Sequence, residues 1–253
     1  MRTVLALTRK EMEQYFASPI AYVVVTLFLL LSGFFFYIYL GFYIQSAQYA
    51  AQMGGEGNEV SQSIIRPFLA NISFFFLIMF PMLTMKTMAE EKKLGTFELL
   101  MTSPITTVQL LLGKFLGALS LMAVILLLLG IYPLVLFIYG SPDPGPIWTG
   151  FLGLFLLGAA FLASGIFFSS LTENQIVAAV FGFVFWLLLW IINFLSRSEA
   201  WYGKLFQYIS VYERFEQFTK GILNLNDAFY FISLAFFGLF VTGIVVQSQR
   251  WKS

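Results

Sequence analysis

Six long apolar stretches constrain the fold of this chain more than any other feature of its sequence. A helix that spans the roughly 30 Å hydrocarbon core of a bilayer needs about 20 mostly apolar residues, because each residue rises about 1.5 Å. We therefore predict an all-α integral membrane protein with six transmembrane helices in a single transmembrane domain over residues 1–253. The predicted membrane helices are residues 20–44, 68–88, 108–138, 147–170, 175–195 and 228–248.

The amino-acid composition agrees with lipid as the main solvent of the chain. Hydrophobic residues make up 59% and charged residues 11%, whereas soluble domains contain roughly 45–50% and about 25%. Phe alone occurs 31 times. A soluble domain of this composition would lack the polar surface that it needs. The net charge of +1 gives no basic footprint for nucleic acid, so we expect no nucleic-acid partner.

Two residue types are missing, and their absence excludes several kinds of chemistry. The chain has no Cys and no His. Without Cys there is no disulfide framework, thiolate metal site or Cys nucleophile. Without His the commonest general base and metal ligand is missing, and haem held by an axial His is excluded. We therefore expect no enzymatic activity and no metal or other cofactor bound by this chain.

Two further segments have amphipathic patterns. Residues 1–18 place charged side chains among apolar ones, which predicts an interfacial helix lying along the membrane plane. Residues 196–227 mix aromatic side chains with alternating charges, which is typical of an interfacial belt or of short helices at the outer leaflet. The residues alone leave open whether this loop only anchors the chain or also gates a path.

Ionisable residues at membrane depth are costly and usually functional, and the six apolar segments contain almost none. Lys114 lies near one end of the third segment, where we expect its ammonium to snorkel to the interface. Glu173 falls in a tight turn, and Thr172 with Gln175 fits a capping box that opens the fifth helix. The Gly-rich stretch from Gly150 to Gly165 favours close packing of helices.

The distribution of Lys and Arg predicts the orientation of the chain. With six crossings both termini lie on one side, and that side carries nine of the 14 Lys and Arg residues. By the positive-inside rule this side is cytoplasmic. We therefore expect a multi-pass protein of the inner (cytoplasmic) membrane with both termini in the cytoplasm.

The densest polar cluster lies between the second and third segments, on the predicted cytoplasmic side. Its first half is charged, and its second half adds apolar side chains such as Phe97 and Leu99. Gly95 costs about 1 kcal/mol relative to Ala in a helix, so we expect a break there. The residues leave two interpretations open: a solvated connector whose charges pair with one another, or a surface that docks into another protein.

The run Glu90-Glu-Lys-Lys-x-Gly95-Thr-x-Glu98-x-Leu100-x-x-x-Pro104, followed by Gly113-Lys114, resembles the signature of type-II ABC exporter permeases. The six-helix layout, the N-terminal amphipathic helix and the turn at 172–174 are also similar to that family. The stretch from Arg214 to Asp227 is similar to the gliding-motility-associated (Gld-type) branch.

The resemblance implies that the chain is a transmembrane permease subunit without its own ATPase activity. Residues 89–103 would form a coupling helix that contacts a cytoplasmic ABC ATPase dimer, which would bind the ATP and Mg. A second permease copy or a related permease would complete the transporter. The residues implied at the ATPase contact are Glu90, Glu91, Lys92, Lys93, Gly95, Thr96, Glu98 and Glu173. The chain has no Gly-x-x-x-x-Gly-Lys-Ser/Thr phosphate loop, in agreement with an ATPase on another chain.

Two functions remain open at this stage. The first is export or envelope remodelling driven by the partner ATPase, with a lipid, a glycan or another amphiphile as substrate. The second is a non-transporting scaffold or mechanotransmission subunit that anchors periplasmic auxiliary proteins through the outer loops 45–67 and 196–227. An intramembrane enzyme is disfavoured, because the chain lacks His and Cys and has hardly any carboxylate at membrane depth.

Overall fold

A computed structural model describes residues 2–53, 59–102, 105–196 and 206–250. The predicted segments 1–18, 89–103 and 196–227 therefore each include residues that lie outside the described ranges. Within these ranges the secondary structure is helical without strands. Six stretches are long and apolar enough to cross a membrane: Pro19–Gln52, Ser61–Lys93, Thr107–Tyr139, Pro144–Leu171, Gln175–Asn193 and Leu225–Gln249. The predicted all-α fold with six candidate membrane spans is confirmed.

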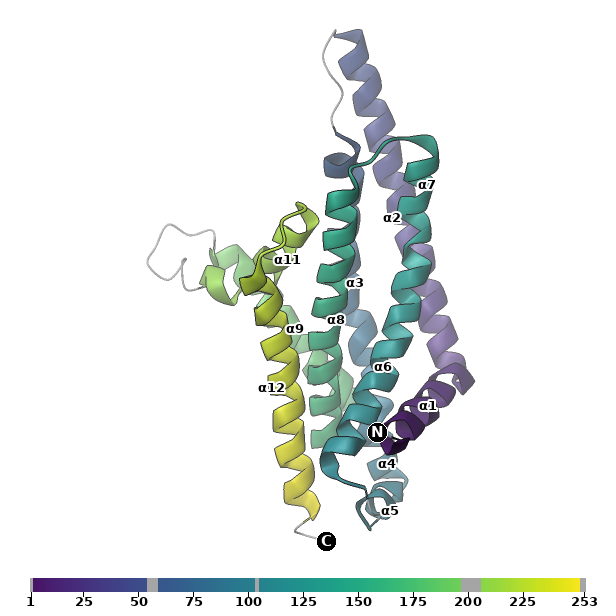
Figure 1. The fold of residues 1–253 in the computed structure, drawn as a ribbon, viewed down its shortest axis with the longest axis vertical. Helices are drawn as coiled ribbons and strands as arrows, with labels where there is room; N and C mark the ends of the chain where they lie inside the picture. The colour runs from purple at the N-terminus through teal and green to yellow at the C-terminus, as the bar shows by residue number, and fades with distance from the viewer. Residues whose placement is uncertain (1, 54–58, 103–104, 197–205, 251–253) are drawn as a thin grey trace.

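The long helices form an elongated bundle with α8 at its centre (Figure 1). α8 packs against α3, α6, α9 and α12, while α2 lies on the outside against α3 and α6. The bundle helices are α2 (Pro19–Gln52), α3 (Arg66–Thr84), α6 (Thr107–Leu129), α8 (Pro144–Leu171), α9 (Gln175–Ser196) and α12 (Leu225–Arg250). α6 continues directly into α7 (Ile131–Tyr139), so the third span is longer than one crossing requires.

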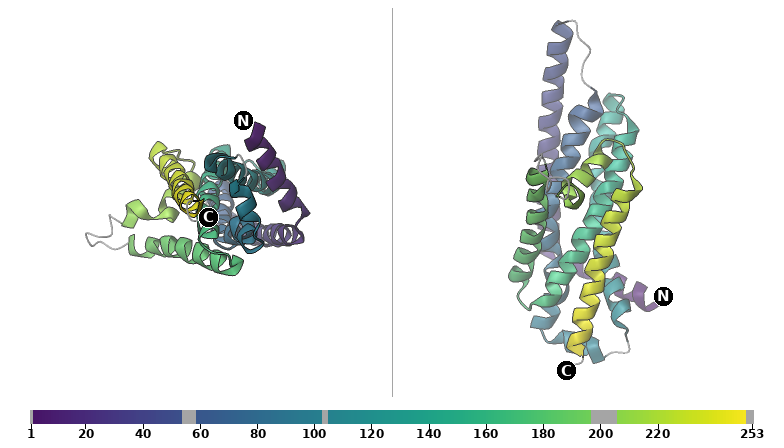
Figure 2. Two further views of the ribbon diagram at one scale, coloured as in Figure 1. Left: turned by 90° about the horizontal axis from the view of Figure 1, so that it is seen from below. Right: turned by 90° about the vertical axis from the view of Figure 1, so that its left-hand side faces the viewer.

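The short elements lie at the two ends of the bundle (Figures 1 and 2). One end carries α1 (Arg2–Ala17), α4 (Lys86–Lys93) and α5 (Thr96–Thr102), and we call it the α4–α5 end. The last turns of α12 reach the same end, while α1 runs across the bundle rather than along it. The π-helical turn η1 (Ser61–Ile65) and α11 (Val211–Thr219) lie toward the other end.

Small residues on α8 allow the neighbouring helices to approach closely, as the sequence predicted. A Cβ added at Gly153 would lie 2.7 Å from the Cβ of Phe218 on α11. Gly150, Gly158 and Gly165 face side chains from α3 and α6 in the same close manner. In lipid, where helices gain little by hiding apolar surface from one another, such close van der Waals packing is a main source of association.

A row of aromatic rings links α3, α8 and α9 and accounts for part of the large Phe content. Phe80 lies 5.9 Å from Phe161 between ring centroids, and Phe161 stacks on Trp186 at 4.0 Å. The buried Trp186 donates from Nε1 to Ser164 Oγ at 2.7 Å, and Ser164 in turn donates to the carbonyl of Phe161. The polar atom of this aromatic core is therefore satisfied, as buried polar groups require.

The outer helices expose most of their apolar side chains. Only 17% of the most apolar window of α2 and of α9 is buried, compared with 61% in the spans that contain α3 and α8. Exposed apolar surface of this extent requires an apolar surrounding, such as lipid or another copy of the chain. α2 also continues past residue 44 to Gln52, and its 34 residues correspond to about 51 Å.

One predicted helix cap is wrong. The sequence placed Thr172 at the N-terminal cap of α9, but Asn174 fills that role. The Asn174 Oδ1 atom accepts from the backbone N–H groups of Ile176, at 3.0 Å, and of Val177. Thr172 Oγ1 accepts instead from the backbone N–H of Asn174, at 3.1 Å. Both are ordinary cap and turn residues, so sequence spacing alone did not separate them.

Candidate functional site

The predicted contact residues lie mainly on α4 and α5, which a break at Gly95 separates. Gly95 has φ +70°, a left-handed conformation that glycine adopts without steric cost. The Thr96 hydroxyl donates to the carbonyl of Glu91 at 3.2 Å and ties the two helices across the break. Lys93 and Glu98 are exposed. The expected break is therefore present, and it separates α4, which has a buried side, from α5, whose described side chains are mostly exposed.

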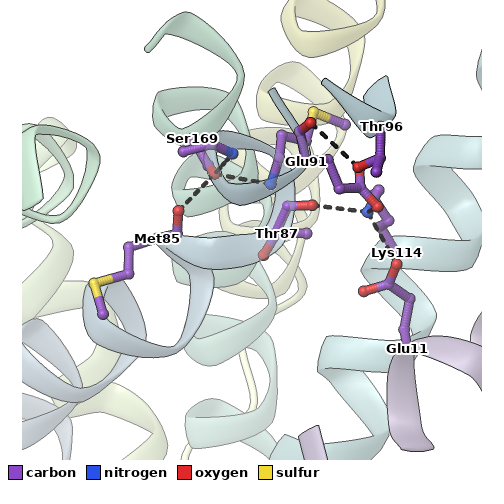
Figure 3. Close-up of polar contacts among 9 residues, drawn as sticks. Glu11, Met85, Thr87, Glu91, Thr96, Lys114 and Ser169 are labelled. Carbon is purple, nitrogen blue, oxygen red and sulfur yellow. Dashed lines mark hydrogen bonds and ion pairs between the residues drawn. The ribbon is translucent and has the colours of Figure 1, made fainter. Parts of the chain in front are cut away.

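The end of α8 holds α4 in place through two serine residues that sequence reasoning did not single out. Ser169 Oγ accepts from the backbone N–H groups of Met88 and Ala89, each at 3.0 Å, and donates to the carbonyl of Met85 at 2.9 Å (Figure 3). Lys92 donates to the carbonyl of Ser170. The first backbone N–H groups of a helix have no partner within it, so α8 supplies what the start of α4 lacks.

Glu173, the predicted contact residue on the α8–α9 turn, is brought close to α4. The carboxylate is exposed and acts electrostatically on the ammonium of Lys92, which also lies 5.3 Å over the ring of Phe97. Lys92 therefore joins α4, α5 and the α8–α9 turn into one surface at the α4–α5 end.

The most unusual feature of this end is a buried cluster of charges around Lys114, on α6 (Figure 3). Lys114 Nζ lies 2.9 Å from Glu11 Oε1 of α1 and 2.8 Å from Glu91 Oε1 of α4. It also donates to the carbonyl of Thr87 at 2.7 Å. The expectation that Lys114 snorkels is wrong, because its side chain is only 2% exposed. α1 covers it, and its charge is met by two carboxylates.

Close packing of α1 on α6 makes this burial possible. Added Cβ atoms at Gly113 and Gly117 would lie 2.5 Å from the Cβ atoms of Leu7 and Glu11, respectively. The two glycines therefore form a flat strip on α6 against which α1 lies. Glu11, which the sequence placed in an interfacial helix among other charges, is buried in this contact. The four-residue spacing of the glycines is the only sequence signal that marks it.

The Lys114 cluster joins three elements that are distant in sequence, but its charges do not balance. One ammonium faces two carboxylates, and Glu91 Oε2 is buried without a hydrogen-bond partner among the described residues. Buried charges are tolerated when they are paired and hydrogen-bonded. The cluster is therefore a tight junction between α1, α4 and α6 with one acceptor left over.

A second charged pair lies toward the opposite end and joins the two ends of the stretch that resembles the Gld-type branch. Arg214 of α11 contacts Asp227 of α12, with 2.7 Å between Nη1 and Oδ1, and both side chains are largely buried. The guanidinium also lies 4.7 Å over the ring of Tyr230 and donates to the carbonyl of Tyr208 at 3.0 Å. This pair fixes α11 against the start of α12.

Removing the Arg214 side chain is expected to destabilise this end. In Arg214→Met the Asp227 carboxylate loses its charged partner, at a cost of about 1.5–3 kcal/mol. Lys220→Met is a matched control, because its pair with Glu216 is partly exposed and four residues apart on α11 and is worth about 0.3–0.5 kcal/mol. Thermal unfolding in detergent measures both. Equal small effects of the two variants would contradict a stabilising role for the Arg214 pair.

The fold and this site define a helical membrane protein with a polar junction at one end of its bundle. A family model described as ABC-2 family transporter protein matches residues 5–247, and the chain belongs to that family of ABC transporter membrane subunits. It is 30% identical over 152 residues to the probable multidrug ABC transporter permease YbhR of Escherichia coli K12. The protein of the same name from Escherichia coli O157:H7 matches equally. The match covers 57% of this chain and 39% of each relative, so the chain spans about two fifths of the length of these curated relatives.

Proposed function

We propose that the chain is the permease subunit of an ABC exporter and that a separate cytoplasmic ATPase dimer drives it through α4 and α5. The observation that carries this proposal is the Lys114 cluster, in which α6 holds both α4 and α1 by buried ion pairs. A segment that merely connected two membrane helices would not need such an attachment. Exposed Leu94 and Leu99 beside it suit a docking surface better than a solvated connector.

In this mechanism the ATPase displaces α4 and α5, and these two helices transmit the displacement to the membrane helices. ATP and Mg bind to the ATPase, and closure of its two halves displaces the segment 89–103 against the membrane domain. The Lys114 cluster passes the displacement to α6 and α1, and the Ser169 contacts pass it to α8. Because α8 packs on most of the other helices, a shift of its end would reach the whole bundle.

Two permeases complete the transporter in this proposal, either as identical copies or as related chains. The exposed apolar faces of α2 and α9 supply surface for the second permease as well as for lipid. We place the α4–α5 end, with both termini, in the cytoplasm, and the chain in the inner membrane, because the Lys and Arg excess lies at that end. Assignment to the Gld-type branch rests on the sequence of the stretch from Arg214 to Asp227.

The substrate that fits best is a lipid, a lipid-linked glycan or another amphiphile. The described spans bury aliphatic and aromatic side chains, and the buried charges that the structure describes pair with one another. Such an interior is poorly suited to a small ion, which needs polar ligands to replace its water. The description of the relative YbhR as a multidrug permease agrees with an apolar or amphiphilic substrate.

Substitutions at the break before α5 and within α5 test the role of the α4–α5 segment in coupling. Glu98→Ala removes an exposed charge, and Gly95→Pro replaces φ +70° with a residue confined to about −65°. We expect permease-stimulated ATP hydrolysis by the purified complex to fall about tenfold or more. We expect the thermal stability of the permease alone to change little in Glu98→Ala, since Glu98 is exposed. Gly95→Pro also removes the hydrogen bond from the Gly95 N–H to the carbonyl of Lys92 and should lower stability more.

The matched control for this test is Asn226→Ala, which changes an exposed polar residue at the opposite end of the bundle. It should leave ATP hydrolysis and complex assembly unchanged. If Glu98→Ala and Gly95→Pro also leave both unchanged, the ATPase does not act through α5 and this assignment is wrong.

The length of α2 favours a second candidate function, mechanical transmission to an extracytoplasmic partner. The helix of about 51 Å exceeds a hydrocarbon core of roughly 30 Å, and it stands out beyond the other helices at the end opposite α4 and α5 (Figure 1). A periplasmic auxiliary protein could dock on this projection. ATP-dependent accumulation of a lipid or amphiphile in inside-out vesicles would favour export. Its absence, with ATP hydrolysis intact, would favour mechanical transmission.

A further inference from the structure

A cavity of about 670 Å³ lies beside the Lys114 cluster, between α1, the first turn of α2, the last turn of α3, and α4 and α5. Ligand pockets in proteins have volumes of about 300–1,000 Å³. The cavity lies where the chain passes from its apolar spans to the charged segment, so its surroundings are the boundary between lipid and water.

The cavity lining contains charged groups that make no hydrogen bond or ion pair with other residues that the structure describes. These groups are Lys10, Lys86 and Glu90, and among them Lys10 acts on the carboxylate of Glu91 through space only. Thr87 also lines it and is only 6% exposed, and its hydroxyl interacts with that of Tyr15 on α1. The lining therefore offers two cations for an anion, beside a buried hydroxyl.

The Lys114 cluster has one more carboxylate than ammonium groups, and this excess indicates which further group a ligand of the cavity should have. Glu91 lines the cavity, and its Oε2 atom is buried without a donor among the residues that the structure describes, while Oε1 already accepts from Lys114 (Figure 3). Beside it, Glu90 adds a further carboxylate. A group with N–H donors and a positive charge would satisfy both. A ligand that meets the lysines and the glutamates together is a zwitterion with an anionic and an ammonium end.

Part of the cavity lining is apolar, which favours an amphipathic ligand. Ile20 and Ala21 at the start of α2, and Met82 and Leu83 at the end of α3, form this part. Ile20 and Met82 are 45% and 40% exposed, so the apolar part of the lining reaches the outer surface of the bundle. A soluble zwitterion would leave this part uncovered, whereas acyl chains would cover it.

We propose that this cavity binds the headgroup of an aminophospholipid, with phosphatidylethanolamine as the type of ligand. The phosphate lies between Lys10 and Lys86, the primary ammonium faces Glu90 and Glu91, and the acyl chains follow Ile20 and Met82. The bound lipid fills the space between α1 and α4, beside their junction at Lys114. This inference does not depend on the ATPase, because it concerns the permease alone.

Binding of defined lipids to the purified full-length chain in detergent tests the proposal. Phosphatidylethanolamine should bind about tenfold tighter than phosphatidylcholine, whose quaternary ammonium has no N–H donor. Phosphatidylethanolamine should also bind about tenfold tighter than phosphatidylglycerol, whose headgroup has no cation. This factor corresponds to about 1.4 kcal/mol, close to the contribution of one hydrogen bond to a charged group. Glycerophosphoethanolamine, which lacks acyl chains, should bind at least tenfold more weakly than the lipid.

Matched variants locate the site. Lys86→Met, Glu90→Gln and Thr87→Val remove cavity groups and should each weaken phosphatidylethanolamine binding several-fold. Lys93→Met and Glu98→Gln make the same charge changes on exposed parts of α4 and α5 outside the cavity and should leave binding unchanged.

Three results would overturn the proposal. Equal binding of the three lipids would show that no headgroup is recognised. Equal losses in the control variants would place binding elsewhere. Equally tight binding of glycerophosphoethanolamine would assign the cavity to a soluble compound. The comparison of lipids uses the unaltered chain, so it tests recognition of the headgroup even if a variant fails to fold.

Discussion

Replacing Lys114 by methionine is expected to lower the stability of the folded chain by about 3–5 kcal/mol. Methionine fills a similar volume, but Glu11 and Glu91 then remain buried side by side without a counter-charge. Breaking a buried ion pair by removing one partner has this cost because the remaining charge stays out of water. For a chain of this size we expect a fall in Tm of roughly 6–20 °C, measured by thermal unfolding in detergent.

Two further variants show whether charge or shape causes the loss. Lys93→Met removes a lysine from the exposed side of α4 and should change Tm by less than about 2 °C, as most surface substitutions do. The triple variant Glu11→Gln, Glu91→Gln and Lys114→Met has no charge in the cluster and should recover much of the lost stability. Failure of the triple variant to recover stability would mean that packing of the lysine stem, not charge pairing, holds the junction together.

The predictable part of this structure follows from local pattern. The six spans follow from hydropathy, because an apolar run of sufficient length has few alternatives to a membrane helix. The break at Gly95 follows from the cost of glycine in a helix, and the structure shows positive φ there. The close approach of helices along α8 follows from its Gly and Ala content. Each of these depends on residues that are neighbours in the sequence.

The Lys114 cluster was not predictable in this way, because it depends on residues far apart in the chain. Glu11 and Lys114 are separated by 103 positions, and neither has an unusual local sequence. Lys114 at the end of an apolar segment matches the ordinary pattern for snorkelling. It is buried only because α1 folds back over α6, and the only local sign of this packing is the pair Gly113 and Gly117.

The coupling segment was recognised in sequence as a motif, but its attachment to the bundle was not. The motif pointed to Glu90, Glu91, Gly95 and Glu98 as one group. The structure divides them, because Glu91 is held inside by Lys114 while Glu98 is exposed. Ser169, which holds the start of α4, comes from a segment that reads as ordinary small-residue packing. In the sequence, a glutamate that forms a buried ion pair cannot be distinguished from a glutamate that is exposed.

Replacing Gly113 and Gly117 together by alanine is expected to lift α1 off α6. The added Cβ atoms would lie 2.5 Å from the Cβ atoms of Leu7 and Glu11, which cannot rotate away because they are next to the backbone. Alanine favours a helix over glycine by about 1 kcal/mol per site, but overpacking costs about 1–3 kcal/mol per site. The displacement also pulls Glu11 away from Lys114. We therefore expect a net loss of stability and a loosened junction between α1, α4 and α6.

A cysteine introduced at Thr8 measures the displacement directly, because the chain has no other cysteine and Thr8 lies against Gly117. Its reaction with a water-soluble maleimide should become several-fold faster in the Gly113→Ala, Gly117→Ala background.

Gly41→Ala is the matched control, since nothing lies within 4 Å of a Cβ at that position. It should retain the slow reaction and gain stability from helix propensity alone. If the double variant behaves like Gly41→Ala, then α1 is not seated on the glycine strip. Another segment would then have to bury Lys114. A displacement of α4 would also not reach α1 through this contact.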